Sequence, residues 1–77
     1  MNPKFVFVFI KNREPVDIYL DKENLFKHVK LFYGEKFHDA LFECFLLDKD
    51  FMDDRYHEYD TYRVRCMTLI DYNMQTT

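Results

Sequence analysis

The sequence predicts a small α+β domain, because segments with strand periodicity flank a segment with helical periodicity. The strand-like segments are 4–12, 16–20 and 61–72, and the clearest helical segment is 22–33. Their order predicts an antiparallel-rich sheet of three or more strands, β-β-α-(α)-β, with one or two helices packed on one face. Seventy-seven residues suffice for one domain at most, so we expect a single domain over 1–77 with a frayed polar tail at 73–77.

The first strand-like segment, Lys4–Asn12, is apolar on both faces, which predicts a central strand covered on both sides. One face carries Phe5, Phe7 and Phe9, and the other carries Val6, Val8 and Ile10. The polar residues Asn12–Pro15 predict a connection to Val16–Leu20, which alternates with period two. We expect this second segment to be an edge strand that pairs with the first as a hairpin, with Val16, Ile18 and Leu20 facing inward.

The helical segment 22–33 has a start signal and a stop signal. Asp21 can accept a hydrogen bond from a free backbone N–H at the start, and Gly34 falls where a left-handed C-cap is needed. The segment 37–47 fits a second helix or a short strand, and its composition favours the helix. The segment 61–72 alternates strongly and predicts a long final strand, preceded by an extended loop over 48–60.

If the helices cover one face of the sheet, one apolar row of the first strand faces away from them. Such an uncovered row is typical of a surface that meets a partner or a second copy of the chain, so a homodimer is one expectation. The alternative is that the loop or the second helix wraps round and covers the row.

The two cysteines, Cys44 and Cys66, lie in apolar surroundings and indicate two buried, reduced core thiols, although one bridge between them fits the sequence as well. The apolar run near the N-terminus is too short for a signal peptide or a membrane span. Together these features predict a cytoplasmic protein.

The stretch 48–62, DKDFMDDRYHEYDTY, is the best candidate for a working surface, and we call it the acidic segment. It carries six carboxylates against one lysine and one arginine, with several tyrosines. Tyrosines of this kind are rigid amphipathic anchors, and carboxylates attract a basic partner. The candidate partner-binding residues are Asp48, Asp50, Asp53, Asp54, Tyr56, Glu58, Tyr59, Asp60 and Tyr62. An ordinary solvated loop is the competing interpretation.

The sequence lacks the usual signs of catalysis. It has no serine to activate, only one glycine for a phosphate-binding loop, and no closely spaced Cys/His pairs for zinc. We therefore expect no enzyme, no cofactor and no metal, and interpret the chain as an inhibitor or modulator of a basic or nucleic-acid-handling protein. Size and composition resemble those of small inhibitors made by phages and mobile elements, which is an analogy only.

Two other functions fit parts of the sequence. The first is a nucleic-acid-binding protein that uses Lys27, Lys30, Arg63 and Arg65, although the net charge of −3 disfavours it. The second is a metal-dependent hydrolase built around Asp48, Asp50 and Asp53.

Overall fold

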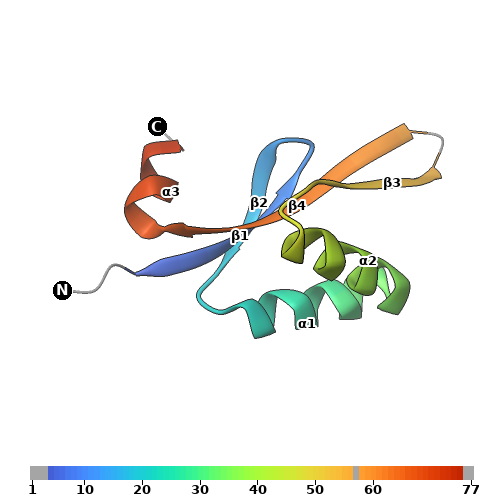
Figure 1. Ribbon diagram of the computed structural model, residues 1–77, viewed down its shortest axis with the longest axis horizontal. Helices are drawn as coiled ribbons and strands as arrows, with labels where there is room; N and C mark the ends of the chain where they lie inside the picture. The colour runs from blue at the N-terminus through green and yellow to red at the C-terminus, as the bar shows by residue number, and fades with distance from the viewer. Residues whose placement is uncertain (1–3, 57, 76–77) are drawn as a thin grey trace.

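The computed structural model of the chain describes residues 4–56 and 58–75, with the side chains of all of these except residues 54–56, 58, 59 and 75. It is a small α+β domain with a four-stranded antiparallel sheet (Figure 1). The elements are β1 (Phe5–Lys11), β2 (Glu14–Tyr19), α1 (Lys22–Tyr33), α2 (Glu35–Leu46), β3 (Phe51–Tyr56), β4 (Glu58–Thr68) and α3 (Leu69–Gln75). The strand order is β2-β1-β4-β3.

The first two strands form the predicted hairpin, with β1 inside the sheet and β2 at its edge. The turn consists of Asn12 and Arg13, which have φ angles of 52° and 69°. A two-residue hairpin turn with positive φ at both positions matches the right-handed twist of the strands. Asparagine adopts this conformation readily, whereas arginine does so with strain.

The predicted faces of β2 are wrong, because a β-bulge shifts its register. Phe9 pairs with Asp17 and Ile10 pairs with Pro15, which leaves Val16 as the additional residue. Without the bulge, Ile18 would lie opposite Phe7 on the face that meets the helices. With it, Tyr19 takes that position. The three apolar residues expected to face inward are all exposed instead: Val16, Ile18 and Leu20.

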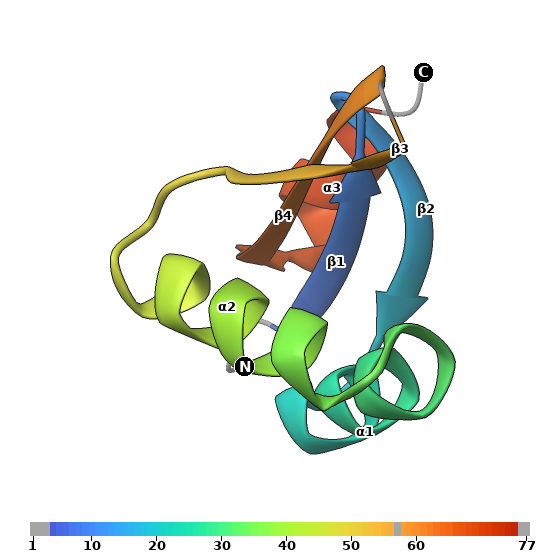
Figure 2. The same ribbon diagram turned by 90° about the vertical axis from the view of Figure 1, so that its right-hand side faces the viewer.

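The helices α1 and α2 form a hairpin joined by a single residue, Gly34, and cover one face of the sheet (Figure 2). The side chain of Asp21 accepts a hydrogen bond from Asn24 N at 2.8 Å, which confirms it as the N-cap of α1. Gly34 has a φ of 96°, a value that residues with a Cβ rarely adopt, so the glycine permits the abrupt turn. The helical alternative for residues 37–47 is also confirmed.

Aromatic side chains fill most of the space between the helices and the sheet. Tyr33 and Phe37 stack with ring centroids 4.5 Å apart, and Phe37 meets the edge of Tyr62 at 4.9 Å. Phe9 on β1 lies 5.8 Å from Tyr62. Rings of this size each bury roughly 150–250 Å², which explains how so short a chain builds a core.

The opposite face of β1 is covered by α3, which the sequence did not predict. Val6, Val8 and Met67 are buried there, and Tyr72 of α3 packs against them. Figure 1 shows α3 on the side of the sheet away from α1 and α2. The predicted strand therefore ends at Thr68, not at residue 72. Residues 73–75 of the tail expected to fray belong to α3, and residues 76 and 77 lie outside the described part of the chain. Within the described part of the chain, no helix is both long and apolar enough to cross a membrane.

Candidate functional site

The acidic segment forms a two-stranded ribbon, not the extended loop that its polarity predicted. Strand β3 pairs antiparallel with the first half of β4, from Phe51 opposite Tyr62 to Tyr56 opposite Glu58. Figure 1 shows this hairpin reaching away from the body of the domain, at the end of the molecule opposite α3. Because the strands are rich in charged residues with little alternation, the usual strand signal is weak. We call the hairpin of β3 and residues 58–62 the acidic arm.

Arg63 holds the start of the acidic arm. Its Nη2 donates to the carboxylate and to the backbone carbonyl of Asp48, both at 2.8 Å, and its Nη1 donates to Asp50 at 3.3 Å. The hydrogen bond from Arg63 lowers the pKa of the exposed Asp48 carboxyl, and its positive charge lowers that pKa further. The same hydrogen bond raises the pKa of Arg63. Two of the predicted docking carboxylates are thus already paired within the molecule.

Asn12 ties the opposite strand of the acidic arm to the β1–β2 turn. Its amide group donates to Asp60 Oδ1 at 3.0 Å, and its side-chain oxygen accepts from Thr61 N at 2.9 Å. Its own backbone N–H donates to Thr61 O at 2.8 Å. The side-chain oxygen of Asn12 therefore accepts the hydrogen bond from Thr61 N that a backbone carbonyl would accept in a continued β1–β4 ladder. The sequence places Asn12 only in a connection between two strands, and no short-range pattern relates it to residue 60.

Two further predicted site residues are buried. Tyr62 is only 4% exposed and belongs to the aromatic core. Asp53 is 7% exposed and is the buried charged residue in the described part of the chain, where it has interactions with its surroundings. Neither side chain is available at the surface in this structure, so both support the arm from inside.

The structure places the nine predicted docking residues in two groups. The five whose side chains it describes are Asp48, Asp50, Asp53, Asp60 and Tyr62, and all of them make contacts within the domain. The side chains of the other four lie outside the described part: Asp54, Tyr56, Glu58 and Tyr59. These four belong to the far end of the arm, where β3 ends and β4 begins.

The residues of the two alternative functions are not assembled in one place. Lys27 and Lys30 are exposed on α1, whereas Arg63 and Arg65 lie opposite Ile10 and Val8 on the face of the sheet away from α1. Among the described residues, no group of three or more His, Cys, Asp or Glu side chains could hold a metal ion.

A hollow between β2 and α1 was not foreseen. Its volume is about 560 Å³, and it is lined largely by aromatic residues, including Phe9, Tyr33 and the exposed Phe32. On its wall the Tyr19 hydroxyl and His28 Nδ1 are hydrogen-bonded at 2.9 Å. Burial, then the nearby Asp17 charge, raises the pKa of Tyr19, so its hydroxyl stays neutral at neutral pH. A neutral phenol beside an imidazole is no activated nucleophile.

Comparison with protein-family models, with curated proteins and with solved structures gives no match to this chain.

Proposed function

We propose that this protein is a small, non-enzymatic protein-binding module that engages a basic surface of another protein through the far end of its acidic arm. The proposal rests on the difference between the two ends of the arm, because the base is hydrogen-bonded to the rest of the domain and the far end lies beyond these bonds. Arg63 and Asn12 fasten its base, and its two strands continue as a ribbon beyond these contacts. Fastening the base reduces the conformational freedom that the arm as a whole has to lose on binding.

The far end has the chemistry that such a partner requires. Its sequence holds two carboxylates, Asp54 and Glu58, and one arginine, together with Tyr56 and Tyr59, and it is flanked by Asp53 and Asp60. An acidic tip attracts a basic surface over several ångströms and accelerates encounter, while tyrosines supply contact area. The partner class that fits is therefore a protein with a basic, nucleic-acid-handling surface, and the module acts as its inhibitor or modulator.

The cysteines support a reducing compartment such as the cytoplasm for this function. Cys44 and Cys66 are both free, and Cys66 is exposed. An exposed free thiol persists more readily where glutathione keeps thiols reduced.

The test is affinity capture from a lysate of the native host with three forms of the protein. The first is the unaltered chain, and the second carries Asp54→Lys with Glu58→Lys at the tip. The third carries Asp39→Lys with Glu43→Lys, which makes the same change of charge on the exposed face of α2. Reversing Asp50 or Asp53 is avoided, because both are involved in contacts within the domain.

We expect the unaltered chain and the α2 variant to retain the same basic partner, and the tip variant to lose it. Circular dichroism establishes that all three forms are folded. Equal capture of the partner by all three forms would overturn the proposal, because the tip would then contribute nothing.

A further inference from the structure

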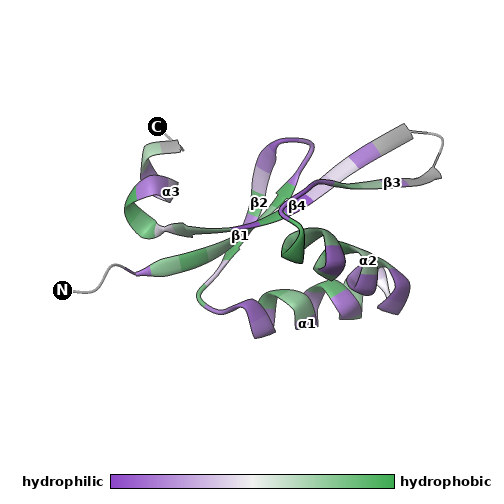
Figure 3. Ribbon diagram, viewed as in Figure 1, coloured by the Kyte–Doolittle hydropathy of each residue, from purple (hydrophilic) through white to green (hydrophobic). Residues whose placement is uncertain are grey.

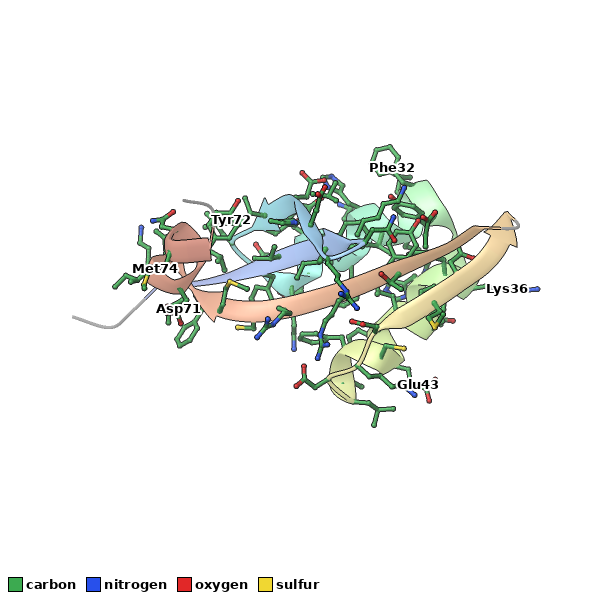
Figure 4. All side chains as sticks on the ribbon, turned by 90° about the horizontal axis from the view of Figure 1, so that it is seen from above. Phe32, Lys36, Glu43, Asp71, Tyr72 and Met74 are labelled. Carbon is green, nitrogen blue, oxygen red and sulfur yellow. The ribbon has the colours of Figure 1, made fainter. Side chains whose placement is uncertain are left out.

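One edge of the sheet is open over half the length of β4. Strand β3 pairs with β4 only as far as Tyr62, whereas β4 continues to Thr68. Within the described part of the chain, no strand pairs with Arg63–Thr68 on the side away from β1. Figure 4, seen from above, shows β3 beside one half of β4, and on that same side no strand beside the half that leads to α3.

The backbone groups along this open edge follow from the register. Leu69 N donates to Lys4 O, and Asn12 N donates to Thr61 O, so the odd-numbered residues of β4 direct their backbone groups toward β1. Residues alternate in an antiparallel ladder, so the even-numbered residues direct theirs outward. The residues with outward N–H and C=O groups beyond the end of β3 are Val64, Cys66 and Thr68.

The other edges of the sheet carry features that prevent pairing. Strand β2 has Pro15, which lacks an N–H, and the bulge at Val16. Strand β3 contains Asp53, Asp54 and Arg55, and charged edge residues disfavour the addition of another strand. The open stretch Val64–Thr68 has no proline and no bulge and carries a single charged residue, Arg65, so it is the least protected edge of the described sheet, and an exposed edge is a template for strand addition.

We propose that a second copy of this chain pairs with the open edge, with strand Val64–Thr68 running antiparallel to its equivalent about a two-fold axis at Cys66. In this register Cys66 lies opposite the second copy's Cys66, and Val64 lies opposite the second copy's Thr68. Arg65 faces the second copy's Met67, so no like charges stand directly opposite each other. The two sheets become one continuous eight-stranded sheet.

Only this register satisfies the outward groups of both copies. An axis at Val64 would place Cys66 against the second copy's Tyr62, whose outer side is already paired with β3. An axis at Thr68 would place Cys66 against the second copy's Ile70, which belongs to α3. The free stretch is thus self-complementary about its centre, as an isologous dimer requires.

Exposed apolar side chains beside the edge supply the contact area that a dimer needs. Phe5, opposite Thr68, is 54% exposed, and Leu46 and Leu47, the last residue of α2 and its C-cap, are 66% and 59% exposed. The last turn of α2 borders the edge, because Phe45 and Cys66 line one hollow of about 290 Å³. Figure 3 shows hydrophobic residues at the start of β1, in the part of β4 that leads to α3, and at the end of α2. A stable dimer buries about 800 Å² per copy, roughly an eighth of this chain's 6116 Å².

The two cysteines make the proposal testable by cross-linking. We expect light scattering to give twice the chain mass of 9.6 kDa, and a short bismaleimide to link two copies through Cys66. The link should survive Cys44→Ser and disappear in Cys66→Ser, which should keep the dimer mass. A mass of one chain at all concentrations, with no cross-link above the level of a denatured control, would overturn the proposal.

A charge at the axis provides a second, independent test. Cys66→Lys places two like charges opposite each other in the dimer, and Cys66 is exposed in the single chain, so the fold tolerates the change. We expect this variant to be monomeric, and Met52→Lys on β3 to remain dimeric. Hydrogen exchange should show the amides of residues 64, 66 and 68 protected in the dimer and exposed in Cys66→Lys. If these amides became protected from exchange only after another protein was added, the edge would bind that protein, and the proposal that a second copy of the chain pairs there would be wrong. The acidic arm is not involved, so either result leaves the proposed function standing.

Discussion

Replacing Asn12 by glycine separates the conformation of the β1–β2 turn from the hydrogen bonds that the turn makes. Glycine adopts the φ of 52° without strain, so the backbone can stay as it is. The variant loses the side-chain bonds to Asp60 Oδ1 and Thr61 N. Any loss of stability therefore reports on the link between the turn and the acidic arm.

The expected magnitude follows from these two bonds. A hydrogen bond contributes about 0.5–1.5 kcal/mol net, and the lower half of that range applies to an exposed site. Adding the greater chain entropy of unfolded glycine gives about 1.5 kcal/mol for Asn12→Gly. In a domain of this size, that loss lowers the melting temperature by roughly 6–12 °C.

The neighbouring position provides the matched control, with the opposite sign. Arg13 has a φ of 69° and makes no side-chain hydrogen bond among those found in the described part of the chain. Arg13→Gly removes the strain of a left-handed arginine, about 1 kcal/mol or more, against an entropy cost of about 0.5 kcal/mol. We therefore expect it to leave stability unchanged or to raise it slightly.

Urea denaturation and thermal melting followed by circular dichroism measure both variants. Equal stability of the two variants would contradict this prediction, because the bonds of Asn12 would then contribute nothing. A useful third form is Asn12→Asp, which keeps the acceptor but loses the donor and places a carboxylate beside Asp60. It should be at least as unstable as Asn12→Gly near neutral pH.

The remaining predictions concern the loop glycine, the arginine contact and the thiols. Gly34→Ala should lower the free energy of unfolding by about 1–3 kcal/mol in urea, because alanine is strained at a φ of 96°; an unchanged midpoint would contradict this. The folded pKa of Asp48 lies below its unfolded value, so its contribution to stability is complete above about pH 4 and is lost as pH falls through the folded value. The stability difference between the unaltered chain and Asp48→Asn should accordingly shrink in acid, and a difference independent of pH would exclude the contact with Arg63. Cys66 should react with a thiol reagent in the folded chain and Cys44 only on unfolding; fast reaction of both would contradict the burial of Cys44.

The sequence predicted correctly the elements that are determined by residues close to one another along the chain. The helix 22–33 has its cap at Asp21 and its stop at Gly34, and both act within a few residues. The central position of β1 followed from apolar residues on both faces, although α3 supplied the cover of the second face. These features are encoded in short stretches that a single sequence reveals.

The elements missed depend on contacts between distant parts of the chain. The bulge at Val16 exchanges the two faces of β2, and nothing within that strand indicates it. Strand β3 is charged and forms because β4 pairs with it. The alternation over 61–72 concealed α3. A continued strand would place Tyr72 on the face of Tyr62 and Val64, whereas in α3 it packs on the opposite face, against Val6, Val8 and Met67. The prediction of two buried thiols was also wrong, since Cys66 is exposed while Cys44 is buried.

For the candidate site, the sequence identified the acidic segment but not the arrangement of its residues. Arg63 and Asn12 engage residues thirteen or more positions away, so the pairing of Asp48, Asp50 and Asp60 could not be deduced from composition. The structure reduces the candidate surface to the far end of the arm. The docking role of that end remains a prediction.

The most direct test of the proposed function is a backbone NMR titration of the labelled chain with the partner that affinity capture provides. We expect the largest shifts on residues 53–60. We also expect Asp54→Lys with Glu58→Lys to weaken binding, and added salt to weaken it as well. Shifts concentrated on α1 or on the hollow between α1 and β2, with binding indifferent to both changes, would contradict the proposed function.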